Sequence, residues 1–159
     1  MASITVITVG TVKEKYLTDC IAEYKKRLST YSKITEIELK EERIINEDND
    51  KEVAAALAAE GDKILSAIPG GALKIALCVE GKQYSSPELA ELIKHGCDST
   101  GKICLIIGSS HGLDERVKAA CDVRLSFSRL TFPHQLMRAV LFEALYRSFT
   151  IIAGKRYHK

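Results

Sequence analysis

Several features that would assign a function directly are absent from this 159-residue sequence. Neither G-x-x-x-x-G-K-[ST] nor G-x-G-x-x-G occurs, which excludes the two standard phosphate-binding loops. No apolar run approaches the roughly 20 residues of a membrane-spanning helix, and no internal repeat or low-complexity segment occurs. The acidic segment 40–50 lacks the ligand spacing of a calcium loop, so we expect a solvated loop there and no metal site.

The cysteines are odd in number and include no C-x-x-C pair. They are Cys20, Cys78, Cys97, Cys104 and Cys121, and several stand in apolar runs. We therefore expect buried free thiols in a reducing compartment, and neither disulfides nor a zinc site. The N-terminal residues have no basic segment before a short apolar run, which favours a first strand over a signal peptide. Together these features indicate a cytoplasmic protein.

The net charge is only +2, but the charges are unevenly distributed. Residues 36–62 hold ten acidic and three basic side chains, whereas residues 124–159 hold seven basic side chains and one acidic. Such asymmetry can mark a binding face for a polyanion. Two solvated faces that attract each other would give the same pattern, so both interpretations stay open.

What is present is an alternation of strand-like and helix-like segments. Short β-branched or apolar runs predict strands, and apolar residues at helical spacing predict the helices between them. The predicted strands are 3–10, 34–39, 73–79, 102–108 and 123–127; the predicted helices are 16–28, 53–68, 86–95 (stopped by Gly96), 114–121 and a long helix from 133. This order predicts one α/β domain spanning residues 1–159, with a mainly parallel sheet flanked by helices.

Ligands of such sheets bind beyond the carboxyl ends of the strands. Those ends are predicted at residues 10–11, 80–81, 108–112 and 128–132. The segment "GSSHG" at 108–112 also matches G-x-S-x-G between a strand and a helix. One alternative is therefore a serine hydrolase with Ser110 as nucleophile, followed by Asp122 and then His134 or His158. Against a hydrolase, the chain is small and no HGGG-like oxyanion segment stands upstream, so the glycines better suit a turn that lets the backbone approach a ligand.

The last helix begins with Pro133-His134 and is apolar nearly all round. Such a helix is buried on more than one side, and a second subunit is a natural cover. Arg138 stands four residues after His134, on the same face, and Glu143 and Arg147 are spaced for an ion pair. Arg138 belongs either to a site or to a buried pair, and His134 either to a site or to a helix-start hydrogen bond. Together, beside a strand-end loop and a basic tail, they favour a site.

Six blocks carry a family resemblance: "VITVGTVKEKYL", "LCVEGKQYSSPELA", "LIIGSSHGL", "LSFSRLTFPHQLMR", "EALYR" and the terminal "YHK". In these blocks, and in their order along essentially the whole chain, the sequence resembles the small bacterial SPOUT methyltransferases of the RlmH type. The resemblance implies methylation of N3 of a pseudouridine in 23S ribosomal RNA of the large subunit, in the assembled 70S ribosome. It also implies S-adenosylmethionine as methyl donor, a homodimer and a C-terminal trefoil knot, without a metal or a membrane.

The resemblance also assigns site residues. The cofactor-binding positions of the family fall on Leu77, Gly108, Phe127, Ser128, Arg129, Leu130, Thr131 and Phe132. Its catalytic positions fall on His134, Arg138, Tyr157 and His158. Members usually have Gly-Gly where this chain has Gly108-Ser109.

Roles for these side chains follow from their chemistry. His134 would help to remove the N3 proton, or Arg138 would stabilise charge on the uracil oxygens as the proton leaves, and both options stay open. Tyr157 would stack on a base. The expected phosphate-binding residues are Arg129, Lys155, Arg156 and Lys159. A second alternative is a non-enzymatic ribosome- or RNA-binding module with the same basic tail.

Overall fold

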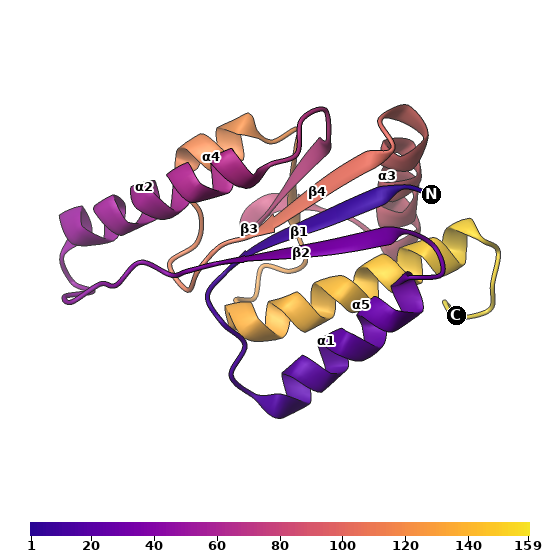
Figure 1. Ribbon diagram of the computed structural model, residues 1–159, viewed down its shortest axis with the longest axis horizontal. Coiled ribbons are helices and arrows are strands. Elements are labelled where there is room, and N and C mark those ends of the chain that lie inside the picture. Colours follow the sequence, from indigo (N-terminus) through magenta and orange to yellow (C-terminus); the bar gives the residue numbers. More distant parts are fainter.

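The computed structural model describes all 159 residues and has one sheet of five parallel strands (Figure 1). The spatial order is β2-β1-β4-β3-β5, and every neighbouring pair is parallel. The strands are β1 (Ser3–Val9), β2 (Lys33–Leu39), β3 (Leu73–Gln83), β4 (Lys102–Ile107) and β5 (Val123–Ser126). The predicted parallel α/β architecture is confirmed.

Helices cover both faces of this sheet (Figure 1). They are α1 (Lys15–Leu28), α2 (Asp50–Ala67), α3 (Ser86–Ser99), α4 (Glu115–Ala120) and α5 (His134–Ile152). Helices α1, α3 and α5 pack into the larger hydrophobic cluster on one face, and α2 and α4 into the smaller cluster on the other. None of the helices has the length and apolar character needed to cross a membrane. The trefoil knot stays a prediction.

The central strand β4 has a continuous apolar sequence because helices cover both faces of the sheet around it. Successive side chains of a strand point to opposite faces, so a strand covered on both faces needs apolar residues at every position. In β4, Ile103 and Leu105 join the larger cluster, whereas Cys104 and Ile106 join the smaller one. The alternation fixes the register of the sheet core.

Strand β3 differs from its predicted end. It continues to Gln83 and pairs again with β5 after an irregularity between Leu77 and Lys82. The expected strand end at residues 80–81 was therefore wrong. A side chain at Gly81 would lie 2.7 Å from the backbone of Arg124, so glycine permits the close approach of the two strands.

Two helix boundaries also differ from prediction. Gly96 lies inside α3, which ends at Ser99, because a Cβ at Gly96 would meet Ile103 at 2.8 Å and glycine lets the helix pack closely on β4. Helix α2 begins at Asp50, because the side chain of Asn49 caps it by accepting backbone N–H groups.

The cysteine prediction is confirmed in one respect and corrected in another. All five cysteines are free, as expected. Only Cys104 is fully buried, and the other four are half-buried. The apolar runs that contain them border the core without lying wholly inside it.

Candidate functional site

A cavity of about 350 Å³ opens beside the irregularity in the middle of β3 and at the carboxyl ends of β4 and β5. Three chain segments supply most of its wall: residues 77–80, residues 107–113, and residues 127–132 without Arg129. Every predicted cofactor-binding residue except Arg129 lines it. Arg129 is exposed and does not line the cavity, although its neighbours do. The volume falls within the range of small-molecule sites.

The loop from Gly108 to Gly112 forms the tightest part of this wall. A Cβ at Gly108 would lie 2.2 Å from the carbonyl oxygen of Gly112, so no other residue fits there without moving the backbone. Gly112 has a φ of +90° and donates its N–H to the carbonyl of Ser109 (2.9 Å). Ser109 is buried in the cavity wall. The turn therefore forms with a serine where family members usually have a second glycine.

The segment after β5 forms the opposite wall. The hydroxyl of Ser126 donates to the carbonyl of Ser128 (3.0 Å), and the backbone N–H of Leu130 donates to the Ser128 hydroxyl (3.0 Å). These bonds fix a turn that presents backbone to the cavity. Leu130 and Phe132 stand exposed at its rim.

One charged pair lies on the cavity wall beside the apolar groups. The ammonium of Lys118 in α4 donates to the carboxylate of Glu80, and this hydrogen bond lowers the pKa of Glu80. Lys118 was not predicted from the sequence, because a lysine within a short helix carries no distinguishing pattern. Burial raises the pKa of the neighbouring Cys78 thiol.

His134 is the first residue of α5 and lines the cavity. Pro133 is the residue before the helix rather than its first turn. His134 also lines a second cavity of about 420 Å³, formed with the ends of β1 and β2. Its imidazole therefore stands at the boundary between two openings.

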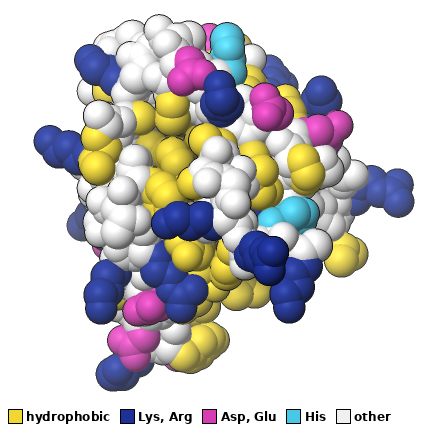
Figure 2. All heavy atoms as spheres, turned by 90° about the vertical axis from the view of Figure 1, so that its right-hand side faces the viewer, with side chains coloured by type: hydrophobic (Ala, Val, Ile, Leu, Met, Phe, Trp, Pro, Cys, Tyr) yellow, Lys and Arg dark blue, Asp and Glu magenta, His cyan; other side chains and the backbone are white.

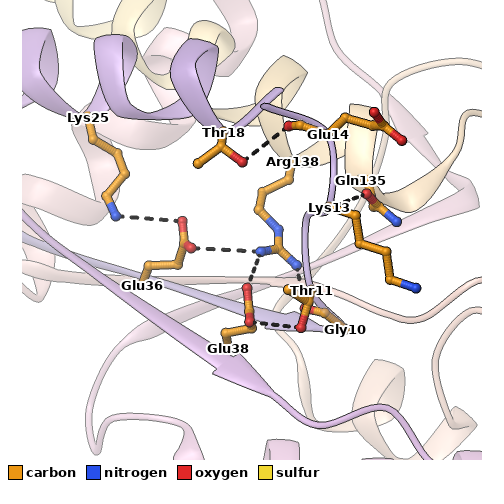
Figure 3. Close-up of polar contacts among 10 residues, drawn as sticks. All are labelled: Gly10, Thr11, Lys13, Glu14, Thr18, Lys25, Glu36, Glu38, Gln135 and Arg138. Atoms are coloured by element: carbon orange, nitrogen blue, oxygen red, sulfur yellow. Dashed lines mark hydrogen bonds and ion pairs between the residues drawn. The ribbon is translucent and has the colours of Figure 1, made fainter. Parts of the chain in front are cut away.

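Arg138 follows His134 by four residues in α5 and is only 2% exposed. Figure 3 shows its guanidinium pointing toward Glu36, Glu38 and the turn at Gly10. Its guanidinium donates from Nη1 to Glu38 Oε2 (2.7 Å) and from Nη2 to the carbonyl oxygen of Gly10 (2.9 Å). Glu36 Oε1 lies 3.8 Å from the same Nη1. Of the two interpretations left open by the sequence, the structure has the buried pair, and Arg138 lines neither cavity. The acidic and basic regions of the sequence thus meet directly.

Tyr157 and His158 lie toward the other end of α5. The Tyr157 hydroxyl donates to Glu143 Oε1 (3.1 Å), and Arg147 Nη1 lies 3.3 Å from His158 Nδ1. Burial and hydrogen bonding raise the pKa of Tyr157. Glu143 follows His134 by nine positions, which is about 14 Å along a helix. Within one chain, the four predicted catalytic residues are therefore not brought together.

The predicted phosphate-binding side chains are all exposed: Arg129, Lys155, Arg156 and Lys159. The last three belong to the tail, which starts at the C-terminal end of α5. Figure 2 shows the side of the molecule that carries both termini in Figure 1, with Lys and Arg side chains around an apolar centre. Lys155 stands over the ring of Tyr31, with its Nζ 5.1 Å from the ring centroid, and all four cations are exposed to a polyanion.

The serine hydrolase triad is not assembled. Ser110 contacts the adjacent His111 (3.3 Å) at the carboxyl end of β4. Asp122 lies at the start of β5 and accepts from the backbone N–H of Lys74 (2.8 Å), at the opposite end of the parallel sheet. Because strand direction separates the two residues, the triad predicted from chain order was wrong. No group of three or more His, Cys, Asp or Glu side chains is arranged to hold a metal ion.

Comparison with known proteins adds a family to this geometry. Residues 2–158 match the family model described as "Predicted SPOUT methyltransferase". The chain belongs to the SPOUT methyltransferase family. Two relatives, from Bacillus pumilus (strain SAFR-032) and Bifidobacterium adolescentis, are each 48% identical to it. The first alignment covers 99% of both chains, and the second covers 98% of this chain and 99% of the relative. Both relatives are named "Ribosomal RNA large subunit methyltransferase H".

A solved structure supports the SPOUT architecture. It is titled "The structure of a probable methylase family protein from Haemophilus influenzae Rd KW20". The match has a TM-score of 0.55 at 14% identity and covers 98% of this chain and 70% of that chain. At this identity the likeness concerns the fold alone. The resemblance seen in the sequence blocks is thus confirmed at the level of the family.

Proposed function

We propose that the protein is an S-adenosylmethionine-dependent methyltransferase that methylates N3 of a pseudouridine in 23S ribosomal RNA, within the large subunit or the assembled 70S ribosome. The names of the relatives support the ribosomal RNA substrate. The observation that carries the proposal is the cavity beside the irregularity of β3 and the carboxyl ends of β4 and β5, which is lined by two loops, 107–113 and 127–132 without Arg129, and by apolar side chains. An rRNA-modifying enzyme of this kind works in the cytoplasm.

The cavity fits the cofactor in size and in chemistry. Leu77 and Phe127 offer apolar surface for an adenine ring, and the absence of a side chain at Gly108 lets backbone approach it closely. No phosphate-binding loop is needed, because S-adenosylmethionine carries no phosphate. When bound, the cofactor supplies an electrophilic methyl group on a sulfonium.

The residues of this chain would then orient the base and receive its proton. N3 of the base must lose its proton as it forms a bond to the methyl carbon, and His134 is the group at the cavity boundary that suits this task. Arg138 is buried behind His134 and reaches Gly10 and Glu38. We therefore propose that Arg138 acts by positioning the neighbouring backbone, without contact with the base.

We propose a homodimer in which the tail of one subunit completes the cavity of the other. Tyr157 and His158 lie about 14 Å or more along α5 from His134 within one chain. A second copy would bring its own tail to that cavity and cover the exposed Leu130 and Phe132. Residues 1–159 would thus act as one SPOUT-type domain per subunit, with Lys155, Arg156 and Lys159 on RNA phosphates.

Titration calorimetry with S-adenosylmethionine tests the cofactor assignment. We expect saturable binding with one molecule per chain. No heat at high protein concentration would contradict the proposal. The alternative of a non-enzymatic ribosome-binding module would show as ribosome binding without methyl incorporation.

A further inference from the structure

The second cavity is the most polar hollow next to the proposed cofactor site. It lies between the turn after β1, the end of β2 and the first turn of α5. Its wall includes Thr11, Lys13, Lys40 and Gln135, and Leu39 is its one hydrophobic lining residue. His134 lines both cavities. Because methyl transfer requires donor and acceptor to meet, an acceptor site has to adjoin the cofactor site, and this cavity does.

The inner wall of this cavity is held rigidly. Glu38 accepts from Arg138 on one oxygen (2.7 Å) and from the Thr11 hydroxyl on the other (3.2 Å), as Figure 3 shows. Arg138 also binds the carbonyl of Gly10, so one guanidinium joins the turn after β1 to the end of β2. The buried positive charge offsets the charge of Glu38. The wall is therefore fixed in position by these hydrogen bonds.

Glu41 is the carboxylate with free acceptor capacity at the boundary. Its Oε2 lies 3.4 Å from the position that a Cβ on Gly10 would occupy, and His134 Nε2 lies 3.3 Å from the same point. Its Oε1 lies 3.5 Å from the hydroxyl of Ser110, which belongs to the cofactor cavity. His134 and Glu41 thus approach Gly10 closely enough to crowd any side chain there, and both line the second cavity.

We propose that this second cavity receives the acceptor base and that Glu41 reads the N1–H group of pseudouridine. Pseudouridine carries N–H groups at N1 and N3, on the two sides of one ring carbonyl, whereas uridine in RNA carries only the N3–H. With His134 beside N3 and Glu41 beside N1, pseudouridine can donate one hydrogen bond to each side chain. Uridine has no N1–H, so it would leave the Glu41 carboxylate without a donor. This inference rests on the proposed function and names the residue that selects its substrate.

A binding experiment without catalysis locates the base. The ¹H–¹⁵N spectrum of the full chain, saturated with S-adenosylhomocysteine, is titrated with pseudouridine 5′-monophosphate and in parallel with uridine 5′-monophosphate. We expect amide shifts at Gly10, Thr11 and Glu41, with affinity for the pseudouridine compound higher by about fivefold or more. Shifts confined to other regions, shifts absent at saturation, or equal affinities would overturn the proposal.

A kinetic experiment separates this proposal from the proposed function. On ribosomes that lack the methyl group, Glu41→Leu should lower kcat/KM by about tenfold or more, with an unchanged dissociation constant for S-adenosylmethionine. Glu41→Gln keeps one acceptor oxygen and should restore most of the activity. Glu91→Leu removes an exposed glutamate on α3 and is the matched control.

The outcomes are distinguishable. If the wild-type protein methylates and Glu41→Leu equals it, the base-reading role fails while the proposed function stands. If the wild-type protein neither binds the cofactor nor methylates ribosomes, the proposed function fails, and the base-reading role fails with it. If Glu41→Leu loses affinity for S-adenosylmethionine in proportion to kcat/KM, Glu41 belongs to the cofactor site and the proposal is wrong.

Discussion

The two ends of α5 use arginine in opposite ways. Near the first end, Arg138 is 2% exposed and binds Glu38 on β2 and the carbonyl of Gly10 after β1. Near the second end, Arg147 is about one-third exposed and pairs with Glu143 of its own helix (2.6 Å) and with the tail. The first arginine joins three elements of the core, whereas the second helps to hold the tail, which also packs through Tyr157 on Glu143 and Tyr146.

This difference indicates that the Arg138 end of α5 is held firmly, whereas the contacts of the tail can be exchanged for others. A charge buried in a pair cannot lose its partner without a large penalty, so the region around His134 is fixed. The tail is held by a partly exposed ion pair and by Tyr157, whose ring lies edge-on to Tyr146 at 4.8 Å. Contacts of this kind contribute little each, and a second subunit can replace them. The first end is suited to chemistry and the second to assembly.

The largest expected effect concerns the cofactor loop beside the first end. Gly108→Arg should lower the affinity for S-adenosylmethionine by at least about 100-fold, a loss of about 2.7 kcal/mol. The physical reason is the 2.2 Å distance from a Cβ at Gly108 to the Gly112 carbonyl, which forces the loop to open. Calorimetry measures the affinity, and circular dichroism verifies the fold. Gly70→Arg, in a turn with no atom within 4 Å of its Cβ, is the matched control. If a folded Gly108→Arg protein bound S-adenosylmethionine with wild-type affinity, the loop at 108–112 would not be part of the cofactor site.

Next in size is the contrast between the two arginines. Arg138→Met should lower the free energy of unfolding by about 2 kcal/mol, because Glu38 and the Gly10 carbonyl lose their donor and the largely buried Glu36 loses a nearby cation. Arg147→Met should cost about 1 kcal/mol or less, since its ion pair is partly exposed. Urea denaturation of both variants gives the comparison. Equal losses would show that burial does not distinguish the two ends.

The tail separates activity from stability. Deletion of residues 156–159 should lower rRNA methylation by at least about tenfold, while the free energy of unfolding falls by no more than about 3 kcal/mol, the value of one aromatic pair and one hydrogen bond to a carboxylate. Methyl incorporation and urea denaturation are measured on the same preparation. Full turnover by the truncated protein would refute a role for the tail in the site.

The smallest effect is a pH dependence of stability near the cavity. The hydrogen bond from Lys118 lowers the pKa of Glu80. A carboxylate with a lowered pKa in the folded state stabilises the fold above its unfolded pKa, and this stabilisation is lost as the pH falls through the folded value. Because Glu80 is half exposed, the effect should stay below about 1 kcal/mol. Urea midpoints at neutral and acid pH should differ less in Glu80→Gln than in the wild type, and an identical difference would show that this pair is not involved.

Much of the fold followed from the sequence because buried strands leave a local pattern. The apolar runs of β1 and β4 and the glycines at 108 and 112 were readable without a structure. The extension of β3 to Gln83 was not, because it depends on pairing with β5 some 40 residues later. Likewise, Gly96 suggested a helix end, but it serves close packing against Ile103.

The sequence predicted the loops of the site, but it did not predict contacts between residues far apart in the chain. Leu77, Gly108 and residues 127–132 were assigned through the family blocks, and all but Arg129 line one cavity. The pairing of Arg138 with Glu38 spans 100 positions, so no local pattern reveals it. The second cavity is formed by three separate segments and has no sequence signature. From the sequence alone, its Glu41 belonged to the segment 40–50 that we expected to be a solvated loop.

A methylation assay on ribosomes that lack the modification tests the proposed function most directly. The wild-type protein and S-adenosylmethionine are incubated with these ribosomes, and the product nucleoside from the large-subunit RNA is identified by mass and chromatography. We expect one methyl group per ribosome, on N3 of a pseudouridine. No incorporation by a protein that binds the cofactor, or a methyl group on any other nucleoside, would contradict the proposed function.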